Sequence, residues 1–239
     1  MRDVFVCWPS ANRERSDENF KKWRDKGYRS LVLLNDGYNT GAKLIIDGVS
    51  TPPIGQPIPF YSRYYEAQNR LARLAFAFSD DACAVVCAND DIDPPEGIPE
   101  AIADECYAHF GGSDCWIMQP QGDRQGLDKH SRSAAQRICG SPWFGPGYVA
   151  RGYCGTGPHW TGAGHYASDV ELREVGDRLK ILWGRDDLTQ FHRHHSWQHT
   201  KEMPYQTATN KRWWKHDEGC LAIRRAAGFP GSDLAPEGA

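Results

Sequence analysis

The sequence lacks a long apolar run and lacks a large excess of charge of either sign. No stretch approaches the roughly 20 apolar residues of a transmembrane helix. The apolar segment 4–8 follows Asp3 and is too short for the core of a signal peptide. With 28 basic and 31 acidic residues the formal net charge is −3, so binding to a polyanion would need a local basic patch. We therefore expect a cytoplasmic protein without a membrane partner.

Closely paired cysteines are also missing. The eight cysteines are scattered through the chain, and none forms the C-x-x-C spacing of a zinc or redox site. Several lie in apolar segments that we expect to be strands. We interpret them as reduced core residues rather than as a disulfide or zinc framework. The H-E-x-x-H pattern of zinc hydrolases is absent as well.

What is present favours one α/β domain over residues 1–239. The chain has 239 residues and 40% hydrophobic content, which is enough to bury a substantial core. In its first half, short apolar runs typical of strands alternate with segments whose apolar residues recur at helical spacing. We predict strands at 4–8, 30–34, 82–88 and 114–119, and helices at 16–26, 64–78 and 98–107. Such alternation predicts a mainly parallel central sheet flanked by helices.

The second half is less regular. Residues 122–164 are rich in glycine and aromatics without sustained periodicity, which predicts an irregular binding or lid segment. A helix at 169–179 and a short strand at 181–183 follow. The tail from Phe191 is rich in histidine, tryptophan and basic residues, and we expect its end, 228–239, to be flexible.

The segment Ala84 to Pro95 is the most informative one, because an apolar strand there ends abruptly in Asn89-Asp90-Asp91. Carboxylates at a strand end bring hard oxygen ligands to the rim of a sheet, where a divalent metal and a phosphate can be held. In an extended strand Asn89 and Asp91 would share one side. If the chain turns there, Asp90 and Asp91 could both reach one ligand. A plain turn before the prolines is the alternative, since these residue types favour turns.

Two further groups could carry chemistry. His192 and His194 alternate as on an extended segment and could complete a metal site, although solvated histidines of a basic tail would look the same. Asp169 follows Ser168 at the start of a predicted helix. Either residue could be the N-cap, or Asp169 could be a general base that deprotonates an attacking hydroxyl.

Taken in order, these features resemble glycosyltransferases of the GT-A fold over roughly residues 3–196. The likeness rests on a strand with Pro9-Ser10 and Arg13, a second strand that ends in Asn35-Asp36, a helix with Gln68-Asn69-Arg70, and the segment VVCANDDIDPP. The resemblance implies a nucleotide-sugar half at about 1–120 and an acceptor half at about 121–200. Residues 201–239 would form a C-terminal extension.

The resemblance also implies roles for individual residues. Asp36 would contact the uracil or ribose of a UDP-sugar, and further donor contacts would come from Pro9, Ser10, Arg13, Asn69, Asn89 and Asp90. Asn89-Asp90-Asp91 matches the family's Asp-x-Asp, with Asn89 as a departure, so Asp91 is the better ligand for Mn²⁺ or Mg²⁺. His192 or His194 would complete the metal shell. Asp169 matches the catalytic base of inverting members.

The sequence does not identify the molecule that would accept the sugar. The chain also resembles viral glycosyltransferases that modify hydroxymethylated bases in phage DNA, and basic residues interleaved with aromatics would suit DNA. Those residues are Arg124, Lys129, Arg132, Arg137, Lys201, Lys211, Arg212, Trp213, Trp214 and Lys215. The two tryptophans could instead be packing anchors. A glycan or small-molecule acceptor, a nucleotidyltransferase and a non-catalytic sugar- or DNA-binding module are the remaining alternatives.

Overall fold

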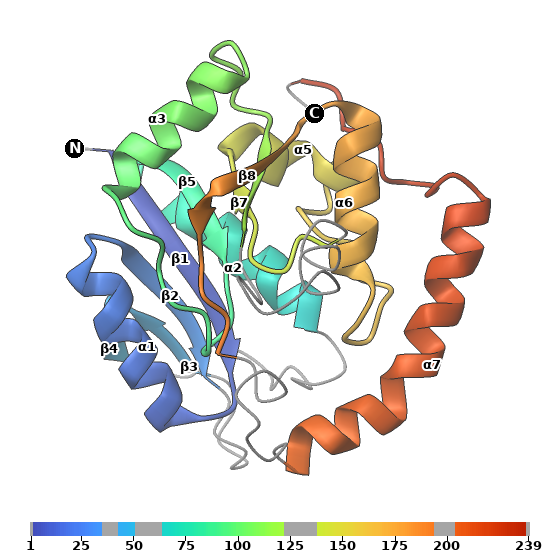
Figure 1. Ribbon diagram of the computed structural model, residues 1–239, viewed down its shortest axis with the longest axis horizontal. Helices are drawn as coiled ribbons and strands as arrows, with labels where there is room; N and C mark the ends of the chain where they lie inside the picture. The colour runs from blue at the N-terminus through green and yellow to red at the C-terminus, as the bar shows by residue number, and fades with distance from the viewer. Residues whose placement is uncertain (1, 35–42, 51–63, 122–137, 194–203, 238–239) are drawn as a thin grey trace.

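One eight-stranded sheet forms the centre of the protein, in the order β4-β3-β2-β1-β5-β7-β6-β8 (Figure 1). The computed structural model describes residues 2–34, 43–50, 64–121, 138–193 and 204–237. The strands are β1 (Asp3–Ser10), β2 (Arg29–Leu34), β3 (Lys43–Ile46), β4 (Val49–Ser50), β5 (Ala82–Cys87), β6 (Ile117–Gln121), β7 (Trp143–Phe144) and β8 (Leu182–Thr189). The result is a mixed α/β domain.

The sheet is mixed, so the prediction of a mainly parallel sheet was wrong. The pairs β1–β2, β1–β5 and β6–β8 are parallel, whereas β2–β3, β3–β4, β5–β7 and β6–β7 are antiparallel. Two local features cause the difference. The strands β3 and β4 fold back along the edge of β2, and the two-residue strand β7 comes from the segment that we expected to be irregular. Neither has enough residues for a clear periodic pattern.

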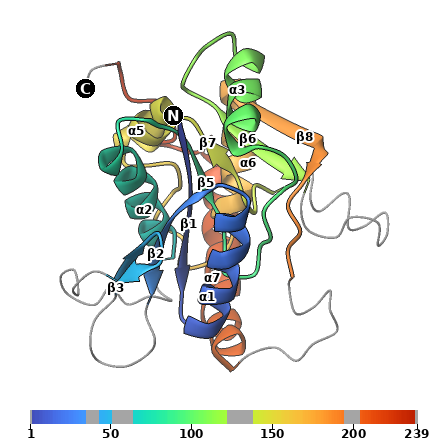
Figure 2. The same ribbon diagram turned by 90° about the vertical axis from the view of Figure 1, so that its left-hand side faces the viewer.

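Helices cover both faces of the sheet. The helices are α1 (Arg13–Asp25), α2 (Tyr64–Phe78), α3 (Pro99–His109), α5 (Pro146–Gly155), α6 (Ser168–Leu179) and α7 (Pro204–Ala226). Alternate residues of β1 point to opposite faces. Val6 and Trp8 belong to the core that includes Trp23 of α1, whereas Phe5 and Cys7 pack with the buried side of α2. Figure 2 shows α1 and α3 on one side of β1, with α2 and α5 on the other.

The region after residue 138 is more ordered than predicted. It contains β7 and α5, and the helical conformation of α5 breaks at Gly152–Cys154, where Tyr153 has a φ of 49°. The end of the chain is also packed where the structure describes it. Phe229 is 7% exposed, and the Cys154 amide donates to the Asp233 carbonyl at 2.8 Å. The prediction of a flexible end was therefore wrong for residues 228–237.

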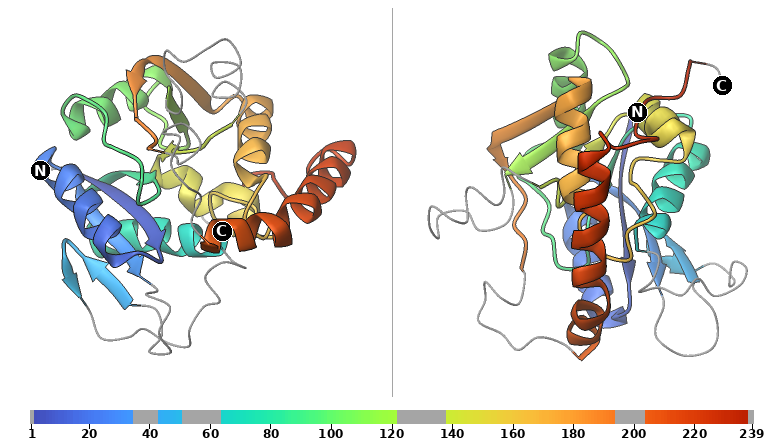
Figure 3. Two further views of the ribbon diagram at one scale, coloured as in Figure 1. Left: turned by 60° about the horizontal axis from the view of Figure 1, so that its bottom comes forward. Right: turned by 90° about the vertical axis from the view of Figure 1, so that its right-hand side faces the viewer.

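The last helix, α7, lies alongside α6 (Figure 3). Its Arg224 pairs with the fully buried Glu171 of α6 at 2.6 Å and stacks over the Trp160 ring at 4.2 Å. All eight cysteines are free, as predicted; six are buried in the core, whereas Cys154 is exposed and Cys220 is partly exposed. Within the described ranges, no helix combines the length and the hydropathy that a membrane crossing requires.

Candidate functional site

The carboxyl ends of several strands meet at one edge of the sheet. Strands β1 and β5 are parallel, and two successive antiparallel steps through β7 give β6 and β8 the same direction as β5. This topology brings three segments together: Ser10 at the end of β1, Asn89–Asp91 after β5, and His192 after β8. An isolated antiparallel bridge between Ile92 and His192 fixes the last of these. The predicted convergence at a strand end is present.

The chain turns directly after β5, and the turn decides where its acids point. The Ile92 amide donates to the Asn89 carbonyl at 3.3 Å. Asp90 Oδ1 lies 3.5 Å from Arg15 Nη2, and Asp91 Oδ2 lies 2.9 Å from the same nitrogen. Both carboxylates therefore face one cationic group. This is the geometry expected for a turn, not the alternation of an extended strand.

Asp91 is the centre of the site. It is 6% exposed, and its Oδ1 lies 3.1 Å from His192 Nε2. The Asp91 carbonyl also accepts a hydrogen bond of 2.7 Å from the Arg193 amide. The two residues predicted as metal ligands, Asp91 and His192, are thus adjacent although they are 101 positions apart in the sequence. His194, the other predicted ligand, lies outside the described residues.

Asp90 has a different environment from its neighbour. Burial raises the pKa of its carboxyl group, and the nearby charge of Asp91 adds to the rise, while Arg15 and a hydrogen bond from Ser10 oppose it. The Ser10 hydroxyl donates to Asp90 Oδ2 at 2.6 Å. Of the two carboxyl groups in the turn, only that of Asp91 also faces an imidazole.

Asn89 points to a third group. Its side-chain oxygen accepts a hydrogen bond from the Tyr64 hydroxyl. Gln68 supports this contact by donating to the Tyr64 hydroxyl at 3.0 Å and to the Ala88 carbonyl at 2.8 Å. Burial raises the pKa of Tyr64, so this phenol stays protonated and can donate. An asparagine here links the turn to α2 without adding a third charge.

Helix α1 holds the turn from the other side. The Trp23 indole donates to the Ile92 carbonyl at 2.9 Å, and the Asn19 amide donates to the Asn89 carbonyl at 3.1 Å. Trp23 and Asn19 are fully buried. These bonds help to replace the water that the two carbonyls lose on burial; a buried carbonyl left without any partner costs about 1–3 kcal/mol. The position of the acids is therefore specified by packing.

The structure places Arg15, and not the predicted Arg13, beside the two acids. Arg13 is exposed and pairs with Asp17 at 2.8 Å, whereas Arg15 contacts the two acids. A signal for this was present, because Asn12 is a strong N-cap residue. Its side chain accepts from the Arg15 amide at 3.0 Å, which starts the helix at Arg13 and turns Arg15 toward the strand ends.

The other predicted donor contacts are dispersed. Pro9 is buried within β1, opposite Leu33 of β2. Asn69 lies on α2, and both ends of its side-chain amide bond the backbone of His159, at 2.8 and 2.9 Å. Asp36 lies outside the described residues. Of the predicted donor-site residues, the structure brings Ser10, Asn89 and Asp90 together beside Asp91.

Asp169 lies in the first turn of α6, and the helix begins differently from the prediction. The N-cap is Ala167, with a φ of 73°, so neither Ser168 nor Asp169 is the cap. The Asp169 carboxylate accepts from the Val170 amide at 2.9 Å. Burial first, and the charge of Asp169 second, raise the pKa of Tyr65. The charge of Asp169 therefore acts on Tyr65.

Two adjacent tyrosines of α2 connect Asp169 with the turn after β5. The rings of Tyr64 and Tyr65 are 5.1 Å apart. Tyr64 bonds Asn89, and Tyr65 faces the start of α6. The predicted base and the predicted metal ligand thus belong to neighbouring parts of one region, joined by the N-terminal turn of α2.

A buried carboxylate of α7 holds the loop that precedes α6. Asp217 is fully buried and accepts from three successive backbone amides, those of Gly164 at 2.9 Å, His165 at 2.8 Å and Tyr166 at 2.7 Å. Burial acts to raise the pKa of this carboxyl group, but these hydrogen bonds and one from His216 outweigh it and lower the pKa. Asp217 therefore fixes the approach to Asp169.

We expect Asp217→Asn to lower the free energy of unfolding at neutral pH by about 2 kcal/mol, because an amide oxygen replaces a charged acceptor. The lowered pKa means that the stabilisation is present above the unfolded value of 3.8 and is lost as pH falls through the folded pKa. Urea unfolding at several pH values measures this. The difference from the wild-type protein should shrink in acid, and Glu218→Gln, an exposed neighbour, should have little effect. A pH-independent difference would contradict the assignment.

The basic residues that favoured DNA are only partly within the described region. Arg124, Lys129, Arg132, Arg137 and Lys201 lie outside it, as do the side chains of Lys211 and Arg212. The Trp213 ring packs against Gly164, which agrees with the alternative that it is a packing anchor. Trp214 is 51% exposed.

Comparisons with known proteins add little. No protein-family model matches the chain, and no curated protein matches it. A solved structure, A197 from STIV, is similar over 80% of this chain and 85% of its own length, with 13% sequence identity and a TM-score of 0.39. The function must therefore be inferred from the residues of this chain.

Proposed function

We propose that the protein is a metal-dependent glycosyltransferase of the GT-A type, which moves a sugar from a nucleoside diphosphate sugar, with UDP as the expected nucleotide, to an acceptor hydroxyl. One observation carries the proposal. Asp91 and His192 face each other at 3.1 Å, at the edge where parallel strands end, and Arg15 and Asp90 lie beside them. Ligands of open α/β sheets bind at such edges.

Asp91 and His192 are suited as ligands to a divalent cation that binds together with a nucleotide. Among the described residues, no group of three or more histidine, cysteine or acidic side chains could hold a metal ion by itself. Mg²⁺ and similar ions are commonly held by one or two carboxylates, with phosphate oxygens and water as the other ligands. Asp91 would supply the carboxylate and His192 a nitrogen. When bound, the cation would stabilise negative charge on the diphosphate.

Arg15 and Asp169 would then have different roles in the transfer. Departure of the nucleoside diphosphate leaves negative charge on its terminal phosphate, and the Arg15 guanidinium is the nearest fixed cation to the two acids. An acceptor hydroxyl is a weak nucleophile near neutral pH. The Asp169 carboxylate would accept its proton as the bond to the sugar forms. The acceptor that we favour is a hydroxymethylated pyrimidine in phage DNA, with a glycan or a small molecule as alternatives.

The first test is a donor screen. Purified protein with Mn²⁺ or Mg²⁺ is incubated with a panel of nucleotide sugars, and release of the nucleoside diphosphate is measured with and without acceptor. We expect slow release from one donor with water alone, faster release with the correct acceptor, and loss of both with EDTA. An absence of release and of binding for every donor would contradict the proposal.

A non-catalytic sugar- or DNA-binding module is the second candidate. It is favoured by one observation, since Arg15 and His192 already contact the two carboxylate oxygens of Asp91 in the structure. Such a module would bind a sugar or DNA in the same experiments without releasing nucleotide. Calorimetric binding combined with the release assay separates the two functions.

A further inference from the structure

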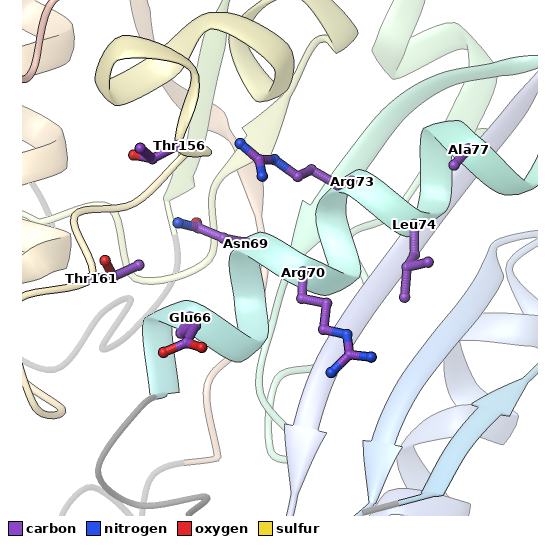
Figure 4. Close-up of a pocket in the computed structure, with 8 residues that line it drawn as sticks. All are labelled: Glu66, Asn69, Arg70, Arg73, Leu74, Ala77, Thr156 and Thr161. Carbon is purple, nitrogen blue, oxygen red and sulfur yellow. The ribbon is translucent and has the colours of Figure 1, made fainter. Parts of the chain in front are cut away.

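A cavity lies away from the strand ends, on the outer side of α2. Its volume is about 430 Å³, and it lies between this helix and the loop that follows α5 (Figure 4). The α2 residues that line it are spaced three or four positions apart and so share one helix face. They are Glu66, Asn69, Arg70, Arg73, Leu74 and Ala77, and they face Thr156 and Thr161. We call this cavity the α2 groove.

The middle of the α2 groove is cationic. Arg70 is exposed and has no ion-pair or hydrogen-bond partner among the residues that the structure describes. Arg73 donates to the Gly155 carbonyl and points toward Thr156 in Figure 4, which holds its guanidinium at the wall of the groove. A guanidinium has five N–H donors, so Arg73 keeps donors for a ligand. Figure 4 shows that Arg70 points away from Thr156, so the two arginines offer separate guanidinium groups to phosphate oxygens.

The remaining lining has the character that a nucleotide chain needs. Leu74 and Ala77 provide an apolar surface beyond the arginines, which can pack against a sugar or a base. The Thr161 hydroxyl is exposed and has no hydrogen-bond partner within the described ranges. Glu66 is the acid of the lining and lies one turn from Arg70, toward the start of α2. Charge is therefore graded along the groove, from the acid end to the cationic middle.

The acid end of the α2 groove adjoins the candidate catalytic residue. Thr161 follows Trp160, whose carbonyl accepts the Ser168 hydroxyl at 3.1 Å in the turn that carries Asp169. Glu66 follows Tyr65, whose pKa responds to the charge of Asp169. The acid end of the groove is thus linked through Tyr65 and Trp160 to the turn that carries Asp169.

We infer that the α2 groove binds the sugar-phosphate backbone of a nucleic acid, with Arg70 and Arg73 as the phosphate contacts. That this nucleic acid is the acceptor rests on the proposed function; its binding does not. The observations favour a backbone over an isolated anion, because apolar positions continue the groove beyond the two arginines. Contacts of this kind give binding that depends on salt and tolerates changes in base sequence.

The test compares Arg70→Gln/Arg73→Gln with the wild-type protein in binding to fluorescent single-stranded and duplex DNA. For single strands each lost phosphate contact lowers the slope of log K against log salt by about 0.7. We expect a slope smaller by about 1.4 and binding roughly ten-fold weaker at about 0.1 M salt. Lys21→Gln/Lys180→Gln removes the same charge from two exposed lysines elsewhere and should leave the slope close to that of the wild-type protein.

Two results would overturn the inference: a wild-type protein that does not bind DNA at low salt, or a groove variant with the wild-type slope. Donor turnover with water is measured in parallel and should be unchanged in the groove variant, because neither arginine belongs to the strand-end site. If DNA binding depends on the two arginines while no nucleotide sugar is bound or cleaved, nucleic-acid binding by the α2 groove is supported and the proposed glycosyltransferase function is contradicted. The two claims are therefore separable.

Discussion

Asp91→Asn is expected to reduce sugar transfer at least a hundred-fold, because the substitution keeps the shape of the side chain and removes its charge. Loss of one group that stabilises a developing charge costs about 10² to 10³ in rate. The Asp91 carboxylate is 2.9 Å from Arg15 and 3.1 Å from His192, so an amide cannot replace it for both partners or for a cation. Initial rates of nucleotide release with saturating Mn²⁺ measure the effect.

The matched control is Asp93→Asn, two positions further along the same turn. Asp93 pairs with Lys22 at 2.9 Å and with Arg193 at 3.1 Å, on the α1 side of the turn. The Asp93→Asn variant loses an ion pair comparable to that of Asp91, but it should keep most of the transfer rate. Circular dichroism and the melting temperature show that both variants are folded. Near-normal turnover in Asp91→Asn would remove Asp91 from its assigned role.

Asp169→Asn is expected to reduce transfer by about 10² to 10⁴, the usual range for a general base. The asparagine can still accept the hydrogen bond from the Val170 amide at 2.9 Å, so the start of α6 should persist. The donor should bind as before, because the substitution leaves Asp91, His192 and Arg15 in place.

The comparison for Asp169 is Asp177→Asn in the same helix, where the carboxylate pairs with Arg173 at 3.2 Å on an exposed surface. Surface pairs of this kind contribute little to stability. We expect the Asp177→Asn variant to transfer sugar at the wild-type rate. If Asp169→Asn transfers sugar at the wild-type rate, another group must be the base, and the connection through Tyr64 and Tyr65 would be structural only.

The elements that could be predicted are those with their own periodic pattern. The helix Tyr64–Phe78 was predicted with its observed bounds, because its apolar residues recur at helical spacing along a complete face. The strand that ends at Cys87 was also predicted, as was the turn alternative for the acids that follow it. In these segments local sequence and tertiary packing favour the same conformation.

Elements that depend on distant partners could not be predicted. The strand Trp143–Phe144 is two residues long and is defined by pairing with β5 on one side and β6 on the other. Asp217 bonds the Gly164 amide across 53 positions of sequence, and nothing near either residue indicates it. The antiparallel strands of the sheet were missed for the same reason.

The candidate site shows the same division. The acids after β5 and the histidine after β8 were identified separately from residue type, and the topology of the sheet places them in contact. Arg15 was missed because its orientation depends on which residue starts α1. Arg13 and Arg15 are only two positions apart, and the start of the helix decides which of them faces the acids. Asn89 is explained by Tyr64, which no spacing rule would have named.

Binding of Mn²⁺ in the presence of UDP tests the central claim most directly. Electron paramagnetic resonance of free Mn²⁺, titrated with protein with and without UDP, reports how much of the ion is bound. We predict strong binding by the wild-type protein and by Asp93→Asn only when UDP is present, and greatly weakened binding by Asp91→Asn and His192→Ala. Binding that is equally strong in the Asp91 variant, or no binding with UDP at all, would contradict the assignment of the strand ends as a metal and nucleotide site.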